Sequence, residues 1–356
     1  MPSKYMQLAD ALRKTLKQHI TDIHYRLPTE MELCRTYGVS RQTVRHALSI
    51  LEKEGTIVKR QGSGSYPSPS LAASSDRIAA VILPDSKAYL HSAALRDIQA
   101  LFSEHHFTVR IFITDYLFER EREILQSLLN EPVCALLAQK VCTACPNPND
   151  DLYKQLAEMG IPIAFWNSGP EIPGTFHVCP DDFQGGYQLT SYLIEHHHQN
   201  IAGIFQIEEL ESHQKFLGCI KALHSHGLMP ETGNFYWYSS FTYPPAKTAP
   251  EPSSFPADFL TRISQNCSAV LCHNDEAAYA LIRALLQQGI SVPGDLAVVS
   301  FDDSYLSELS PVRITSMACR KEKPWTSAAG FLLQRCRDSN ALPDKLFWQL
   351  HKKDSD

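Results

Sequence analysis

Two arginines near the start of the chain, Arg41 and Arg45, lie four residues apart. Side chains at that spacing share one face of an α-helix. Arginine carries a planar fork of N–H donors that matches the O6 and N7 acceptors of guanine in the major groove of DNA. The pair therefore predicts a helix face that contacts DNA; the alternative is a solvated basic face without a partner.

The residues around this pair predict two helices joined by a tight turn. Thr29 and Glu32 have the spacing of a capping box, which satisfies two backbone donors at a helix start. Gly38 suits the left-handed conformation that ends a helix, and Ser40 is a second N-cap residue. After Ser40, apolar residues recur at helical spacing: Val44, Ala47, Leu48 and Leu51.

A short basic hairpin follows the second helix, because residues 57–58 open a strand and residues 60–64 form a Gly-containing basic turn. Two helices, a turn and such a hairpin predict a winged helix-turn-helix. In helix-turn-helix domains the N-terminal part of the second helix enters the major groove. We therefore expect Ser40, Gln42 and Thr43 to contact phosphates or base edges beside the two arginines.

The segments LPTE (27–30), VSRQTVRHALSILEKEG (39–55) and RQGSGSY (60–66) resemble the GntR family of bacterial transcription factors. The resemblance covers residues 2–66. It implies backbone contacts near the first helix, major-groove contacts from the second helix of the motif and minor-groove contacts from the wing tip. The residues that it points to, in that order, are Lys4 and Tyr5, then Arg41, Thr43 and Arg45, then Gln61 and Gly62. Thr29, where the family usually has Ser, is a further candidate for DNA contact.

Charge is unevenly distributed over the 356 residues. Residues 1–70 contain 11 Lys and Arg against 6 Asp and Glu, whereas the remainder contains 22 against 33. A basic head on an acidic body is the electrostatic pattern expected of a DNA-binding module attached to a separate domain.

The segment PSPSLAASSD, residues 67–76, reads as a linker, and buried strands alternate with helices after it. Such alternation predicts parallel sheets covered on both faces. We expect an α/β domain of two doubly wound parallel-sheet lobes, preceded by a small winged helix-turn-helix domain, and a frayed tail after Leu350. The expected boundaries are 1–68 for the head, 69–76 for the linker and 77–356 for the body, with lobe 1 at about 77–178 and 305–340 and lobe 2 at about 179–304 plus the tail.

Ligands of open parallel sheets bind beyond the carboxyl ends of the strands. Polar and aromatic residues at these positions are Tyr89, Lys140, Trp166, Asn167, Asp275 and Asp302. A carboxylate can accept bonds from two adjacent hydroxyls, and an aromatic ring can lie against a sugar face, so these residues predict a small-molecule site. We favour Asp275 as a ligand contact; each residue alone could equally cap a helix.

A second resemblance covers about residues 77–350. Its segments are residues 178–205, 215–223 (KFLGCIKAL), 268–304 (SAVLCHND to VVSFDDS) and 309–317, which resemble the effector domain of the LacI family. It implies two lobes joined by three crossover strands, a ligand in the cleft and a dimer. Asp275 falls on the family's ligand-hydroxyl carboxylate. Lys215 stands where the family usually has a ligand-gripping Arg; Lys lacks the planar fork, which leaves the class of ligand open.

These patterns predict a ligand-controlled transcription factor, a repressor that acts as a homodimer on a pseudo-palindromic double-stranded DNA operator. The combination of a GntR-type head and a LacI-type body resembles the arabinose-repressor group of Gram-positive bacteria, so arabinose is the leading candidate effector. A second hypothesis keeps the DNA head but makes the effector a phosphorylated sugar, a nucleoside or a metal. A third, an enzyme fused to a DNA head, ranks last.

Other signals are weaker. No apolar stretch suits a signal peptide or a membrane span, so we expect a cytoplasmic protein without a membrane partner. No P-loop, nucleophile elbow or HExxH motif is present, and we expect no enzyme activity and no cofactor. Cys142-x-x-Cys145 lacks the second CxxC of a zinc site, and the run His196 to His198 is expected at a helix end, so we predict no metal site.

Overall fold

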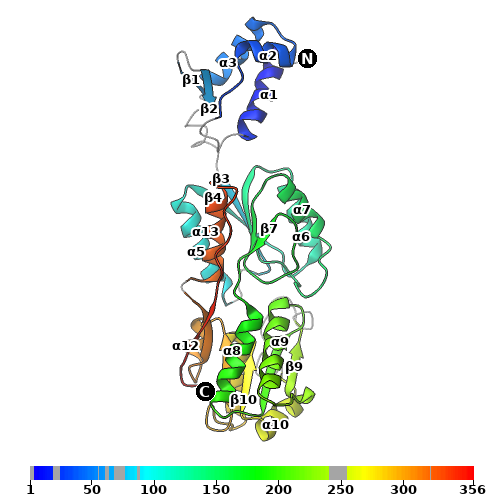
Figure 1. Cartoon of the computed structure of the whole chain (residues 1–356), viewed down its shortest axis with the longest axis vertical. Coiled ribbons are helices and arrows are strands. Elements are labelled where there is room, and N and C mark those ends of the chain that lie inside the picture. The colour runs from blue at the N-terminus through cyan, green and yellow to red at the C-terminus, as the bar shows by residue number, and fades with distance from the viewer. Residues whose placement is uncertain are drawn as a thin grey trace. The chain divides into compact units, whose positions relative to one another are not determined.

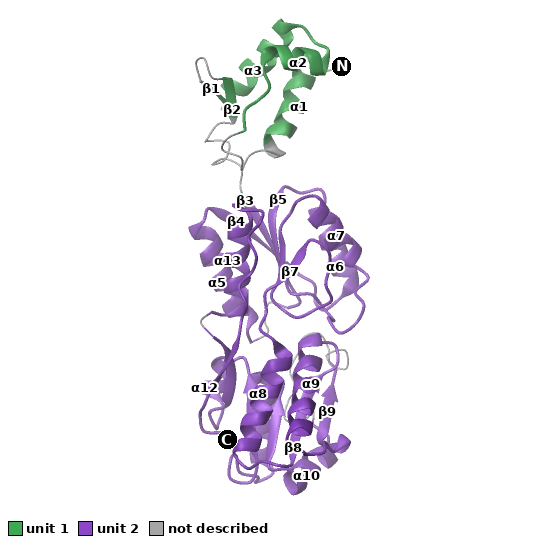
Figure 2. Ribbon diagram, in the orientation of Figure 1, with its two compact units in different colours: residues 1–77 green, residues 78–356 purple. Residues whose placement is uncertain are grey.

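The computed structural model describes residues 4–18, 25–54, 56–60, 64–67, 77–85, 89–239, 255–320 and 322–356. The chain divides into two compact units, residues 1–77 and residues 78–356 (Figure 2). The wing-tip residues Gln61 and Gly62 and most of the expected linker lie outside the described residues.

Unit 1 is a winged helix-turn-helix, as the sequence predicted. Its elements are α1 (Lys4–Gln18), α2 (Glu30–Tyr37), α3 (Arg41–Lys53), and the antiparallel wing strands β1 (Ile57–Arg60) and β2 (Gly64–Pro67). The predicted caps are confirmed: Thr29 and Glu32 form the capping box, and Gly38 ends α2 with φ 61°. Ser40 accepts a bond from the backbone N–H of Thr43 at the start of α3. The buried leucines Leu12, Leu33 and Leu51 anchor one core shared by the three helices.

The first lobe of unit 2 is a five-stranded sheet in the order β4-β3-β5-β6-β7. Its strands are β3 (Arg77–Leu83), β4 (Phe107–Ile113), β5 (Val133–Ala138), β6 (Ile163–Phe165) and β7 (Thr175–His177). Alternate residues of β3 face opposite sides. Val81 packs with α5 (His91–Glu104) and α13 (Pro324–Arg335), whereas Ile82 packs with α6 (Phe118–Leu128) and α7 (Asp150–Glu158), so helices cover both faces (Figure 1).

The second lobe is a six-stranded sheet in the order β13-β12-β11-β10-β8-β9. Its strands are β8 (Ile201–Gln206), β9 (Phe235–Tyr238), β10 (Ala269–Cys272), β11 (Ala297–Phe301), β12 (Thr315–Cys319) and β13 (Trp348–His351). Core residues of α8 (Asp182–Glu195) and α9 (Leu210–Ser225) pack on one face, and those of α10 (Ala257–Asn266) and α11 (Asp275–Gln287) on the other. The short η1 (Thr232–Asn234) and α12 (Tyr305–Leu309) complete the lobe. The predicted architecture of two parallel-sheet lobes is confirmed.

The chain crosses between the two lobes three times, as the resemblance implied. The crossings lie between β7 and α8, between β12 and α13, and between α13 and β13. Two of them run side by side, because Pro180 and Leu346 form an isolated parallel bridge. The sequence predicted that residues 305–340 return to lobe 1. This was wrong for α12 and β12, which belong to lobe 2. β12 pairs with β11, so the return to lobe 1 begins only at α13.

The expectation of a frayed tail was also wrong. Ser355 is fully buried, and its hydroxyl donates to the carbonyl of Val298 while accepting from the N–H of Thr315. Arg313 also forms an ion pair with Asp354 at 2.7 Å. Backbone N–H groups also bond across, from Val298 to Ser355 and from Asp354 to Arg313, so this segment is held to the sheet although its polar sequence carries no periodic signal for it.

Helices α8 and α9 lie unusually close together because each contributes a glycine to the contact. A Cβ atom on Gly186 would lie 2.0 Å from the carbonyl oxygen of Lys215, and one on Gly218 would lie 2.0 Å from that of Phe183. Neither position therefore accepts a larger residue without a shift of backbone. This contact fixes the N-terminal half of α9, which carries residues of the site described below.

Among the described residues, no helix is long and apolar enough to cross a membrane.

Candidate functional site

Arg41 and Arg45 lie on the exposed face of α3. Their side chains are 64% and 61% exposed, and each Nε lies within hydrogen-bond distance of Glu30, at 2.9 Å for Arg41 and 3.1 Å for Arg45. Glu30 belongs to the first turn of α2. Hydrogen bonds from Arg41, with those from Arg45, lower the pKa of Glu30. One surface carboxylate thus holds two exposed guanidinium groups side by side, where an incoming phosphate or base can compete for them.

The other candidate DNA contacts surround this pair. Gln42 is exposed, while the hydroxyls of Ser40 and Thr43 lie 2.9 Å apart at the start of α3. Thr29 uses its hydroxyl to donate to Glu32 within the capping box. On α1, Lys4 is exposed and the ring of Tyr5 lies 4.3 Å from that of His46 on α3. The described candidates therefore gather around the N-terminal parts of α1, α2 and α3.

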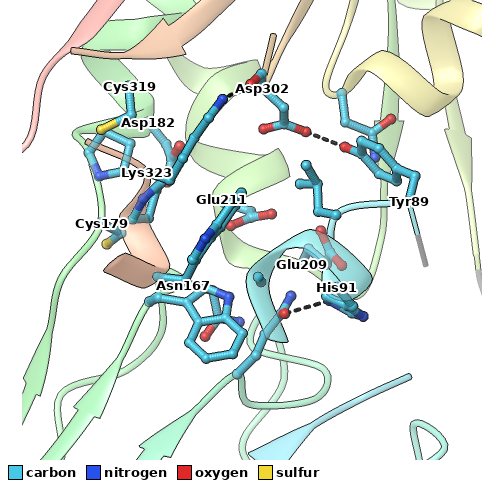
Figure 3. Close-up of a pocket in the computed structure, with 18 of the residues that line it drawn as sticks. Tyr89, His91, Asn167, Cys179, Asp182, Glu209, Glu211, Asp302, Cys319 and Lys323 are labelled. Atoms are coloured by element: carbon cyan, nitrogen blue, oxygen red, sulfur yellow. Dashed lines mark hydrogen bonds between the residues drawn. The ribbon is translucent and has the colours of Figure 1, made fainter. Parts of the chain in front are cut away.

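A cavity of about 130 Å³ lies between the two lobes of unit 2 (Figure 3). One water needs roughly 10–15 Å³ by this measure, so the cavity can hold several waters or a small ligand. Lobe 1 contributes mostly aromatic and neutral polar residues, which include Tyr89, His91, Tyr116, Gln139, Trp166 and Asn167. Lobe 2 contributes all of the carboxylates, which are Asp182, Glu209, Glu211, Glu276 and Asp302.

Asp302 connects the two faces of this cavity. It follows β11 and accepts a hydrogen bond from the phenol of Tyr89 in lobe 1, and its backbone carbonyl lies 3.4 Å from Nζ of Lys323 in the second crossing (Figure 3). Its φ angle of 98° is strained for a residue with a side chain. Burial raises the pKa of Asp302, which Lys215 and Tyr89 partly oppose. A strained backbone and a contact between lobes are together typical of a functional position.

Lys215 lines the same cavity but has little free surface, since its side chain is 3% exposed. Its ammonium group donates to the carbonyl of His273 at 3.1 Å and lies 3.9 Å from Asp182. It also lies over the rings of Phe301 and Trp348, at 4.6 and 5.3 Å from their centroids. Burial by itself lowers the pKa of Lys215. The nearby carboxylates, led by Asp182, raise it by more, so the pKa of Lys215 lies above its ordinary value. The lysine is therefore a charged group whose partners come from the protein itself.

The structure does not place Asp275 on the cavity. Its carboxylate is fully buried inside lobe 2 and accepts three bonds, from the hydroxyls of Ser300 and Ser316 and from the backbone N–H of Ser304. Burial raises its pKa to about 7. The first turn of α11 directs the side chain of Asp275 toward the sheet, and that of the next residue, Glu276, toward the cavity, so a ligand contact by Asp275 stays a prediction.

Lys140 is also absent from the cavity lining. Its ammonium group forms an ion pair with Asp150 at 2.6 Å and lies 5.8 and 5.6 Å from the ring centroids of Tyr153 and Phe165. The other sequence candidates, Tyr89, Trp166, Asn167, Lys215 and Asp302, all line the cavity. Lys140 follows a strand as they do, but its long side chain folds back against α7.

Several lining residues were missed by the sequence argument. Glu209 and Glu211 come just after β8. They therefore occupy the position beyond a strand end that identified the other candidates, and the sequence contains this signal. Asp182 and Glu276 lie in the first turns of α8 and α11, where the sequence does not tell a cap from a cavity residue. Burial raises the pKa of both carboxyls to about 7.

The two motifs that could bind a metal are Cys142-x-x-Cys145 and the histidine run 196–198. No group of three or more His, Cys, Asp or Glu in that part of the chain is placed to hold a metal ion. Cys142 is buried, and burial raises its pKa to about 12, whereas Cys145 is exposed. His196 is the C-cap residue of α8, and its Nδ1 lies 2.8 Å from the carbonyl oxygen of Tyr192.

Two family profiles match different parts of the chain. Residues 4–66 match "Bacterial regulatory proteins, gntR family", and residues 190–354 match "Periplasmic binding protein-like domain". An "Arabinose metabolism transcriptional repressor" of Geobacillus stearothermophilus is 30% identical over 335 residues, which cover 93% of this chain and 90% of that protein. The chain belongs to this family of gntR-type repressors. It is a DNA-binding transcriptional regulator with a separate small-molecule-binding domain.

Other relatives of this chain are also named transcriptional repressors. An "Arabinose metabolism transcriptional repressor" of Halalkalibacterium halodurans is 29% identical over 94% of this chain and 89% of its own length. An "HTH-type transcriptional repressor PurR" of Vibrio parahaemolyticus is 25% identical over 88% of this chain and 93% of that protein.

A solved structure, that of the Escherichia coli transcriptional repressor ascG, is similar in fold at a TM-score of 0.65 and 19% identity. The match covers 78% of this chain and 98% of that one.

Proposed function

We propose that the protein is a repressor of sugar-utilisation genes of the arabinose type, and that a sugar in the interlobe cavity releases it from DNA. The observation that carries this proposal is the cavity itself, in which carboxylates of lobe 2 face aromatic rings and neutral polar groups of lobe 1. Carboxylates accept bonds from sugar hydroxyls, and aromatic faces pack on sugar rings. The names of the two most identical relatives reported above support arabinose as the sugar.

Asp302, Asn167, Trp166 and Tyr89 are the proposed sugar contacts. Asp302 offers a half-buried carboxylate on a strained backbone. Asn167 offers an amide whose oxygen and nitrogen bond to the backbone of Lys140, just after β5. Trp166 offers an apolar ring surface. Lys215 acts from behind, as a counter-ion that fixes Asp182 and supports Trp348.

On the DNA side, we propose that a homodimer reads a pseudo-palindromic operator. Arg41 and Arg45 leave Glu30 to bind base edges, while Ser40, Gln42 and Thr43 position α3 in the groove. Lys4, Tyr5 and Thr29 are proposed to contact the backbone; Gln61 and Gly62 keep their proposed role at the wing. Half-sites should lie about one helical turn, or a multiple of it, apart. Such a protein works in the cytoplasm, where bacterial DNA lies.

The proposed coupling runs through the contact between lobes. The phenol of Tyr89 donates a hydrogen bond to Asp302 across the cavity. A sugar hydroxyl that takes over this carboxylate changes what holds the lobes at their present separation. To act on DNA, the sugar must bind the DNA-incompetent state more tightly, typically by about 1–3 kcal/mol.

The test is the release of DNA by sugar. An operator is first selected from random duplex DNA with the purified full-length protein, and its binding is followed by fluorescence anisotropy while L-arabinose is added. The proposal expects a saturable loss of anisotropy, with no such loss for the same concentration of a non-sugar polyol such as glycerol. Operator binding that is insensitive to L-arabinose and to other neutral pentoses and hexoses would overturn it.

A further inference from the structure

The cavity lies where helix N-termini converge, and each terminus carries a carboxylate of this chain. Asp182 lies in the first turn of α8 and Glu276 in that of α11, while Glu209 is the N-cap residue of α9 and Glu211 lies in its first turn. All four line the cavity. Helix N-termini attract anions, and in other proteins they bind phosphate groups. Here the protein's own carboxylates occupy the positions at which a ligand phosphate would otherwise be stabilised.

Lys215, the more buried of the two described lysines of the cavity, does not offset this negative charge for a ligand. Among the residues that the structure describes, five carboxylates line the cavity, together with the ammonium groups of Lys215 and Lys323. Lys215 is already surrounded by Asp182, a carbonyl oxygen and two aromatic rings. The substitution of Lys for Arg at this position raised the question of an anionic effector; the geometry answers it, because the ammonium group has no free side to offer to a phosphate.

We propose that Glu209, Glu211 and Glu276, named the charge filter, admit neutral sugars and exclude their phosphate esters. This inference rests on the proposed function and specifies the class of its effector. Asp182 is left out of the filter because Lys215 neutralises it, and Asp302 because it is a proposed sugar contact. In Figure 3 the side chain of Glu211 lies between Asp302 and Glu209 at the centre of the labelled residues.

The charge of the filter is unfavourable even before an anion arrives. Burial raises the pKa of Glu209 well above its ordinary value, and Glu211 raises it further through its charge and a hydrogen bond. Burial, followed by the charge of Asp302, raises the pKa of Glu276 to about 7. A phosphate dianion would therefore either meet ionised carboxylates or force them to take up protons, and both oppose its binding. A sugar hydroxyl can bond to either form of the carboxyl.

The experiment is isothermal titration calorimetry of the full-length protein with L-arabinose and with L-arabinose 5-phosphate. The native protein is expected to bind the phosphate ester at least 100-fold more weakly than the sugar. Glu211→Gln and Glu276→Gln, on different helices, should each narrow that ratio by tenfold or more, because each removes an ionisable carboxyl group and keeps the shape of the side chain. Glu195→Gln, an exposed change on α8 of the same lobe, is the matched control and should leave the ratio as it is.

The outcomes separate this inference from the proposed function. Equal affinity of the native protein for sugar and ester overturns the filter and leaves the sugar-responsive function standing. A large ratio that neither glutamine variant narrows also overturns it. Absence of L-arabinose binding overturns the proposed effector, and the filter with it. If one variant does not fold, as judged by its melting transition, the other decides the question.

Discussion

The arginines of the head and Lys215 of the cavity are used in opposite ways. Arg41 and Arg45 are more than half exposed and share one surface carboxylate, so they can exchange this partner for another. Lys215 is buried, and its partners are all internal. The comparison teaches that a charged residue in a binding site is a ligand contact only if its interactions within the protein can be replaced at low cost. By that criterion the head is prepared for an anionic partner, DNA, and the cavity is prepared for a neutral one.

The largest effect is expected from removal of the exchangeable arginines of the head. Arg41→Ala or Arg45→Ala should weaken specific operator binding by roughly 5- to 150-fold, since one bidentate base contact is worth about 1–3 kcal/mol. The melting temperature should hold, because both side chains are exposed. Anisotropy with the selected operator measures the effect, and Arg283→Ala, an exposed arginine of unit 2, is the control. Unchanged operator affinity in both variants would contradict the proposal that α3 binds in the major groove.

The second change addresses the cavity. Asp302→Asn should raise the L-arabinose concentration needed for release of the operator by roughly tenfold or more, since a hydrogen bond to a charged group contributes about 1.5–3 kcal/mol. DNA binding without sugar should persist, because the substitution leaves unit 1 untouched. The measurement is the dose response in the anisotropy assay. A native dose response would exclude Asp302 as a sugar contact.

The third change uses the carboxylate that the sequence favoured. Asp275→Asn should destabilise unit 2 by about 1–3 kcal/mol, because the amide cannot accept from all three of the donors that surround Asp275. Thermal unfolding measures this loss. The L-arabinose affinity of the folded variant should fall less than that of Asp302→Asn, so the two variants form a matched pair for stability and binding. A larger loss of L-arabinose affinity in Asp275→Asn than in Asp302→Asn would instead indicate that Asp275 contacts the sugar.

The smallest effect is expected at the carboxylate that holds the two arginines. Glu30→Gln should change the stability of unit 1 by less than about 1 kcal/mol, because surface ion pairs contribute little. Binding to non-operator DNA should strengthen slightly, since one negative charge leaves the DNA-facing surface. Salt-dependent anisotropy with a scrambled duplex is the measurement. Weaker binding to every duplex would instead show that Glu30 is needed to position Arg41 and Arg45.

Local signals predicted the described helices and strands of the head, and the architecture of the body only in part. The capping box of Thr29, the left-handed Gly38 and the N-cap of Ser40 all depend on neighbouring residues, so the sequence contains them. The alternation of strands and helices likewise predicted both lobes. The return of β12 to the second sheet and the buried position of Ser355 depend on pairing between distant segments, which no local pattern reports.

The site shows the same division. Residues that follow strands were found as a group, because the ends of parallel strands converge on one edge. Which of two adjacent residues faces the cavity was not predictable. Asp275 and Glu276 are neighbours at the start of α11, and only the rotation of that helix against the sheet decides that the first is internal and the second lines the cavity.

The central claim is that a neutral sugar binds between the lobes. Calorimetric titration of the full-length protein with L-arabinose, in parallel with Asp302→Asn, tests it most directly. The account predicts saturable binding of one sugar per chain that the variant weakens by tenfold or more. Binding of equal strength in the two proteins, or absence of binding to the native protein, would contradict it.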